Sequence, residues 1–190
     1  MIEQKNLHSS KEVHGQYMTP VSLAEDLLSN IKLGDGYYIE PSFGTGNFID
    51  ALLSLGVSSE KILGVELYQS LFDSYKTKDT GVKLVCENIY DFNIETKGKI
   101  NFVGNLPFRT PANSLTTHKS EIQRLTKKYK IKGVREECVF FLLKLTELLQ
   151  NNNGGELHLI LPKIIFTNNS KFFVRFNEFL DQTYEVIGNT

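Results

Sequence analysis

The feature that most constrains this fold is a glycine-rich turn, Glu40–Phe48, with the sequence Glu-Pro-Ser-Phe-Gly-Thr-Gly-Asn-Phe. Before it, Tyr37–Ile39 is short and β-prone, which predicts a strand. After it, apolar residues recur at helical spacing through Leu55, which predicts a helix. Gly44 and Gly46 allow a positive φ or a close approach of ligand to backbone, and the helix would point free N–H groups at that ligand. The pattern indicates a ligand loop, but an ordinary turn with two glycines fits this segment nearly as well.

A second apolar segment strengthens the ligand hypothesis. Ile62–Glu66 predicts a buried strand that ends in a carboxylate. In doubly wound α/β folds, an acid at the tip of the second strand accepts hydrogen bonds from the ribose hydroxyls of a nucleoside ligand. Glu66 is therefore a candidate ribose ligand, and the alternative is a solvated acid at a strand end.

The turn resembles the cofactor loop of class I S-adenosylmethionine (SAM) dependent methyltransferases, and more narrowly that of the adenine-specific DNA methyltransferases of restriction-modification systems. Their loop is written Asp-Pro-x-x-Gly-x-Gly-x-Phe, so Glu stands here for Asp. A dinucleotide dehydrogenase would carry a third glycine where this chain has Asn47–Ile49. The resemblance implies that SAM is bound by residues of this loop and of the second strand end, namely Glu40, Pro41, Phe43, Gly44, Gly46, Phe48, Glu66 and Leu67.

The segment Gly15–Pro20, Gly-Gln-Tyr-Met-Thr-Pro, is similar to one that precedes the cofactor loop in these methyltransferases. By this resemblance, Tyr17 and Thr19 contact the methionine end of SAM. The residues alone predict only that Thr19 is the N-cap of a helix with Pro20 in its first position.

The turn after a third predicted strand, Val82–Cys86, is expected to meet the adenine of SAM. In the family an Asp there accepts from the adenine amine, and the next residue packs on the ring. The aligned residues are Asn88 and Ile89, and Asn keeps a carbonyl acceptor. Asp91 is the alternative acceptor, and the sequence does not decide between them.

A fourth strand, Ile100–Gly104, leads into Asn105-Leu106-Pro107-Phe108, which resembles the catalytic turn of the same enzymes. The exocyclic amine of adenine is a poor nucleophile because its lone pair is delocalised. Oxygen acceptors from the Asn105 side chain and the Leu106 carbonyl would favour a tetrahedral nitrogen, while Phe108 stacks on the base. Leu106 departs from the commoner Pro, and Asn-Leu-Pro-Phe is also similar to the rRNA adenine dimethyltransferases.

The rest of the chain is expected to hold a basic segment, two helices and two strands. Residues 109–135 are too long for a plain connection. Between His118 and Arg135 this segment has seven Lys or Arg and one acid, either a solvated helix face or a surface that follows phosphates. The elements expected after it are a helix at Glu136–Gln150, a strand at Leu157–Leu161, a loop then a helix at Phe166–Leu180, and a last strand at Tyr184–Ile187.

Composition limits the alternatives. The net charge of −1 gives no overall attraction to nucleic acid, so any binding must come from a local patch. The two cysteines, Cys86 and Cys138, lie outside any metal-binding pattern and are expected to be buried thiols of a reducing compartment. No apolar run could cross a membrane, so a cytoplasmic location is expected, with neither a metal nor a membrane partner.

We therefore expect one Rossmann-like α/β domain over residues 1–190, with a mostly parallel sheet, helices on both faces and a flexible segment 1–13. The resemblance implies transfer of methyl from SAM to the N6 amine of adenine in DNA, within a restriction-modification system. The target-recognition region of such enzymes is not expected within this sequence, so the resemblance implies a separate specificity subunit or a missing domain. The alternatives are an rRNA or tRNA adenine methyltransferase, and a truncated SAM-binding fragment without activity.

Overall fold

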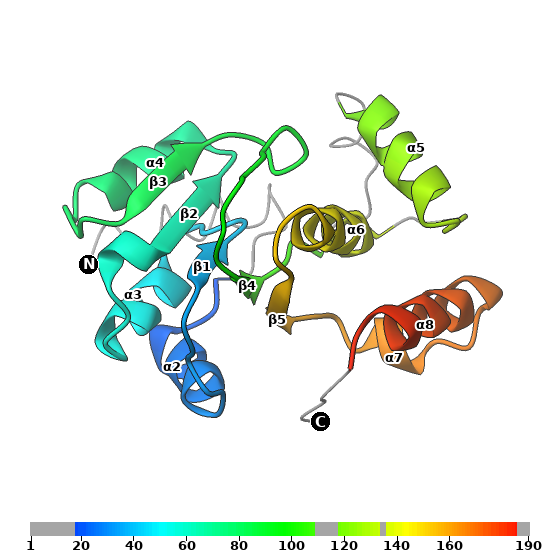
Figure 1. Cartoon of the computed structure of the whole chain (residues 1–190), viewed down its shortest axis with the longest axis horizontal. Helices are drawn as coiled ribbons and strands as arrows, with labels where there is room; N and C mark the ends of the chain where they lie inside the picture. The colour runs from blue at the N-terminus through cyan, green and yellow to red at the C-terminus, as the bar shows by residue number, and fades with distance from the viewer. Residues whose placement is uncertain (1–17, 109–117, 134–135, 186–190) are drawn as a thin grey trace, which may run out of the picture.

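The centre of the fold is a five-stranded parallel sheet (Figure 1). The computed structural model describes residues 18–108, 118–133 and 136–185. The strands are β1 Tyr37–Glu40, β2 Ile62–Glu66, β3 Lys83–Cys86, β4 Ile100–Asn105 and β5 Gly155–Ile160. Their order is β3-β2-β1-β4-β5, and each neighbouring pair is parallel. The chain moves outward from β1 to β3 and then returns to place β4 on the other side of β1.

Helices connect the strands and cover the sheet. In chain order they are α2 Val21–Ser29, α3 Asn47–Ser54, the 3-10 turn η1 Ser59–Lys61, α4 Gln69–Lys76, α5 Lys119–Lys128, α6 Glu137–Gln150, α7 Ile164–Thr167 and α8 Lys171–Thr183. Within the described ranges, no helix is long and apolar enough to cross a lipid bilayer.

Side chains of alternating strand residues enter two separate apolar clusters, as the pleat of a strand requires. In β1, Tyr38 packs with residues of α2 and α3, whereas Ile39 packs in the cluster that contains α6 and α8. In β4, Val103 packs in the same cluster as Tyr38, and Phe102 packs in the same cluster as Ile39. The sheet is therefore the middle of three layers. This confirms the expected Rossmann-like α/β fold, in which parallel strands are buried on both faces.

Three expectations about local structure were wrong. Helix α2 begins at Val21 with Pro20 as its N-cap and no side-chain cap bond, so Thr19 does not cap it. Cys86 is exposed, because it ends β3, which lies at one edge of the five-stranded sheet. Tyr184 and Glu185 are not in a strand, and the rest of that predicted strand lies outside the described residues.

Candidate functional site

The predicted site residues lie at the carboxyl ends of the central strands. Glu40 ends β1, Glu66 ends β2 and Asn105 ends β4. Strands β2 and β4 lie on either side of β1, and the chain leaves β1 toward one side and returns on the other. Open α/β sheets bind ligands at such a topological switch point, outside the carboxyl ends of the strands.

The glycine-rich turn has the backbone that the sequence predicted, and its own packing also requires it. Gly44 and Gly46 have φ of 56° and 80°, and Gly46 is the N-cap of α3. A Cβ on Gly46 would lie 2.0 Å from the Tyr75 ring, and one on Gly44 would lie 2.9 Å from Met18 Sδ. Neither contact was predicted. Met18 lies within the Gly15–Pro20 motif but was given no role there, and Tyr75 belongs to no motif, so only the fold shows that both side chains pack on the turn.

Glu66, at the end of β2, holds this turn in place by hydrogen bonds. Its carboxylate accepts a hydrogen bond from the Gly44 N–H at 2.8 Å and another from the Tyr68 N–H at 2.9 Å. The side chain is only 3% exposed, and burial raises its pKa while the bonds from backbone N–H groups oppose that rise. Each carboxylate oxygen still has a second lone pair. Glu66 can therefore hold the loop and accept from a ligand hydroxyl at once.

Glu40 is a buried carboxyl with one unsatisfied oxygen. It is 4% exposed, and among the described residues its Oε2 has no hydrogen-bond partner. Burial raises its pKa well above the ordinary value, and proximity to Glu66 adds to the rise, whereas a backbone hydrogen bond at Ile49 lowers it. Burying an unsatisfied carboxyl is costly. A ligand that brought a positive group to this oxygen would remove much of that cost.

Thr19 joins the predicted cofactor loop to the predicted catalytic turn. Its hydroxyl accepts a hydrogen bond from Asn105 Nδ2 at 3.1 Å. Its carbonyl accepts one from the side chain of Asn47, the first residue of α3. The structure thus brings together Thr19 and Asn105, which are 86 residues apart in sequence. Tyr17, predicted beside Thr19, lies outside the described residues.

The rest of the catalytic turn packs partly into the core. Leu106 is 1% exposed, whereas Pro107 and Phe108 are half-buried. Phe108 packs against the apolar cluster that contains α6. Leu106 is thus an apolar core side chain. Its departure from the commoner Pro keeps an apolar residue at this position.

The turn after β3 does not decide between the two predicted adenine acceptors. Asn88 Oδ1 accepts from the Tyr90 N–H at 3.0 Å, so this side chain stabilises the turn itself. Ile89 is buried in the core. Asp91 is exposed and lies 3.6 Å from His118 Nδ1. Both acceptor assignments stay predictions.

The other residues predicted to bind the cofactor divide into a buried and an exposed group. Pro41, Phe43 and Phe48 are buried beneath the turn, and Phe43 contacts the Tyr75 ring at a centroid distance of 5.5 Å. Leu67, directly after Glu66, is 52% exposed. An apolar side chain left open beside a strand end offers a surface on which a flat ring could pack.

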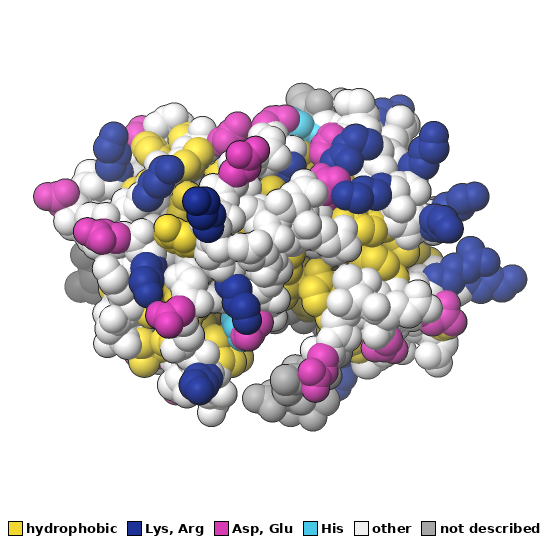
Figure 2. All heavy atoms as spheres, viewed as in Figure 1, with side chains coloured by type: hydrophobic (Ala, Val, Ile, Leu, Met, Phe, Trp, Pro, Cys, Tyr) yellow, Lys and Arg dark blue, Asp and Glu magenta, His cyan; other side chains and the backbone are white. Residues whose placement is uncertain are grey.

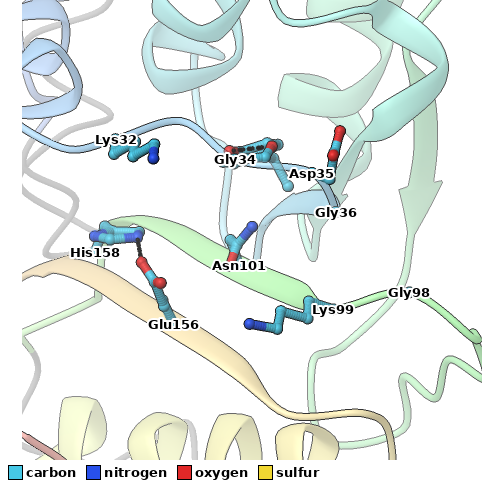
Figure 3. A pocket seen from close by; sticks show the side chains of 10 residues that line it. Lys32, Gly34, Asp35, Gly36, Gly98, Lys99, Asn101, Glu156 and His158 are labelled. Atoms are coloured by element: carbon cyan, nitrogen blue, oxygen red, sulfur yellow. Dashed lines mark hydrogen bonds and ion pairs between the residues drawn. The ribbon is translucent and has the colours of Figure 1, made fainter.

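A cavity of about 470 Å³ lies at the opposite end of the sheet, where the strands begin (Figure 3). Asn101 of β4 and the hydrogen-bonding pair Glu156 and His158 of β5 line one side, facing the loop that carries Lys32 and Asp35. None of the predicted site residues lines it. Within the described ranges, no group of three or more His, Cys, Asp or Glu side chains could hold a metal ion.

Comparison with known proteins supports the methyltransferase resemblance. No family profile matches the sequence. The Type II methyltransferase M.NspV of Nostoc sp. is 25% identical, over 78% of this chain and 35% of that protein. The chain thus spans about a third of that curated relative. A crystal structure of a Listeria monocytogenes protein, assigned to the class I SAM-dependent methyltransferases, superposes with a TM-score of 0.62 at 16% identity, over 90% of this chain and 53% of that one. The resemblance to the methyltransferases and the predicted fold are confirmed.

Proposed function

We propose that this chain is the catalytic unit of a SAM-dependent methyltransferase that modifies the N6 amine of adenine in DNA. The observation that carries the proposal is the link from Asn105 through Thr19 to Asn47. It places the predicted catalytic amide beside the glycine-rich turn at the switch point of the sheet. The similarity to a Type II methyltransferase supports the activity, and DNA as substrate rests on the motifs and on that distant relative.

The described residues fit SAM at this site. The unsatisfied Oε2 of Glu40 suits the ammonium group of a methionine moiety. Glu66 lies at the strand end where ribose hydroxyls are held in related folds, and the open side chain of Leu67 suits a purine ring. When bound, SAM supplies an electrophilic methyl group on a sulfonium.

The chain's own part in the reaction is to position and polarise the acceptor amine. The Asn105 amide donates through Nδ2 to Thr19, which fixes the orientation of its Oδ1. An oxygen held in that place can accept an N–H of the target amine and raise the electron density on nitrogen. The amine nitrogen forms a bond to the methyl carbon as the sulfonium S–C bond breaks to leave a thioether, and the nitrogen then loses one proton to water. In duplex DNA the target base would first flip out of the stack.

The test is methyl transfer measured separately from cofactor affinity. Asn105→Ala is expected to lower incorporation of labelled methyl into adenine-containing duplex DNA by at least about 100-fold, the scale reported when one oriented polar group is removed from an active site. SAM affinity, measured by calorimetric titration, should stay within about threefold. Asn169→Ala, at an exposed asparagine before α8, is the matched control and should change neither quantity.

The same assay distinguishes the alternative substrate that Asn-Leu-Pro-Phe suggests. Digestion of the product to nucleosides separates methylated deoxyadenosine from methylated adenosine. Labelled adenosine from RNA, without labelled deoxyadenosine from DNA, would replace the DNA assignment. Transfer to DNA only in the presence of a second polypeptide would indicate a separate specificity subunit. Absence of SAM binding would favour a fragment without activity of its own.

A further inference from the structure

Helix α5 has two kinds of cationic side chain, and the first kind is paired. Arg124 binds Glu121 at 2.6 Å and also binds Glu147 of α6. Lys128 binds Glu147 at 2.7 Å. Glu147 is only 7% exposed, and the Arg124 guanidinium is the main reason that its pKa lies at about 2. These cations hold α5 on α6 and are not available to a partner.

The second kind is unpaired within the described part of the chain. Lys119, Lys127 and Lys130 are exposed, and none forms an ion pair with a described residue. We call these three residues the lysine stripe. Lys119 and Lys127 are eight positions apart, which is about 12 Å along a helix, and Lys130 follows its end. Ile122 and Leu125 bury one side of α5 in the core, while the three lysines remain exposed to solvent.

The stripe begins beside the turn that follows β3, which is predicted to meet the adenine of SAM. His118, the residue before α5, contacts the Tyr90 ring at a centroid distance of 5.7 Å and lies 3.6 Å from Asp91. Both belong to the turn that follows β3 at the carboxyl edge of the sheet. Figure 2 shows Lys and Arg side chains gathered over the region of α5, where Asp and Glu side chains are fewer. Because the net charge of the chain is −1, this excess of positive side chains is confined to one region.

We propose that the lysine stripe binds the phosphate backbone of duplex DNA next to the target adenine. The inference rests on the proposed function, since that function supplies the polyanion. Lysines that pair with no carboxylate can each neutralise one phosphate and release counterions, which makes binding depend on salt. Contacts of this kind carry no sequence information, so the stripe would position the duplex without selecting a recognition sequence.

The test compares two triple variants that change net charge equally. Lys119→Gln, Lys127→Gln and Lys130→Gln together remove the stripe. The matched control combines Lys32→Gln, Lys83→Gln and Lys97→Gln, three exposed lysines near the amino ends of β1, β3 and β4. Binding to a fluorescent duplex oligodeoxynucleotide is measured by anisotropy over a range of NaCl concentrations. Circular dichroism and a urea titration show whether each variant folds like the wild type.

The stripe variant should have a shallower plot of log K against log salt, by about 2.7, because each lost phosphate contact removes about 0.9. The control variant should keep the wild-type slope. Equal slopes for the wild type and stripe variant would overturn the proposal, as would a wild type that binds no duplex at low salt. A change with single-stranded RNA and none with duplex DNA would also overturn it.

Methyl transfer separates this inference from the proposed function. At low salt and saturating DNA, the stripe variant should keep the wild-type kcat and show a higher KM for DNA. If the wild type transfers methyl but the two slopes agree, only the stripe proposal fails. If the slopes differ and the wild type transfers no methyl to DNA, the stripe proposal stands and the proposed function fails.

Discussion

Substitution of Gly46 tests whether packing against Tyr75 fixes the conformation of the predicted cofactor loop. Substituting alanine places a Cβ 2.0 Å from Tyr75 Cε2 and 2.2 Å from Cδ2, at a backbone φ of 80°. The Tyr75 ring cannot move aside freely, because its hydroxyl donates to Asp50 Oδ1 at 2.7 Å and the ring contacts Phe43 in a tilted arrangement. Gly46→Ala should therefore both strain the backbone and displace a buried ring.

The expected loss is the sum of two costs. A non-glycine residue in the left-handed region costs about 1 to 2 kcal/mol. Overpacking a filled site costs about 1 to 3 kcal/mol, and weakening the Tyr75 bond to a carboxylate adds to this. We expect Gly46→Ala to lower the free energy of unfolding by about 2 to 5 kcal/mol in urea titrations followed by circular dichroism.

Gly56 is the matched control, because its φ is 85° and a Cβ there would meet no atom within 4 Å. Gly56→Ala should show the backbone cost alone, about 1 to 2 kcal/mol. In a Tyr75→Ala background, the further cost of Gly46→Ala should fall to that same value. Equal losses for Gly46→Ala and Gly56→Ala in the wild-type background would refute the steric reasoning.

Two further substitutions test the ion pairs of α6 and the link at Thr19. Because the pKa of Glu147 falls from an ordinary 4.5 to about 2 in the folded chain, its stabilising contribution is present above pH 4.5 and is lost as pH falls toward 2. Glu147→Gln should lower the free energy of unfolding by roughly 2 to 3 kcal/mol at pH 7 and make it depend less on pH between 4.5 and 2. Glu178→Gln, at an exposed and unpaired position within the described residues, should change neither. Thr19→Val removes the acceptor for Asn105 Nδ2 and should slow methyl transfer about tenfold, while Thr19→Ser keeps the hydroxyl and should retain most of the rate. Unchanged transfer in Thr19→Val would show that this bond does not orient the amide.

The sequence predicted the local parts of this fold well. Ile62–Glu66 is a strand with the expected limits, and all five residues are buried, as a central parallel strand requires. The positive φ values of Gly44 and Gly46 also follow from the sequence, because the motif places glycine where other residues are strained. Periodicity and glycine chemistry act over a few residues, so they are visible without a structure.

Contacts between distant segments were not predictable in this way. Thr19 has the sequence context of an N-cap, yet its hydroxyl accepts from Asn105, 86 residues later. Glu147 lies in an apolar helix, and only the packing of α5 on α6 shows why a charge is tolerated there. Cys86 follows the apolar residues Leu84 and Val85, but the place of β3 at the edge of the described sheet exposes it. Local propensity carries no information about such partners.

The two carboxyl groups of the proposed cofactor site differ in what satisfies them. Both are buried, but Glu66 accepts from the Gly44 and Tyr68 N–H groups, whereas Glu40 keeps an oxygen with no partner among the described residues. Burial raises the pKa of Glu66, but its bonds from backbone N–H groups favour the charged form and oppose that rise. For Glu40, burial and the nearby Glu66 both raise the pKa, which favours a neutral carboxyl until a cation arrives. A bound cationic ligand would favour the charged form of Glu40. Ligand binding and loss of the Glu40 proton would therefore be coupled.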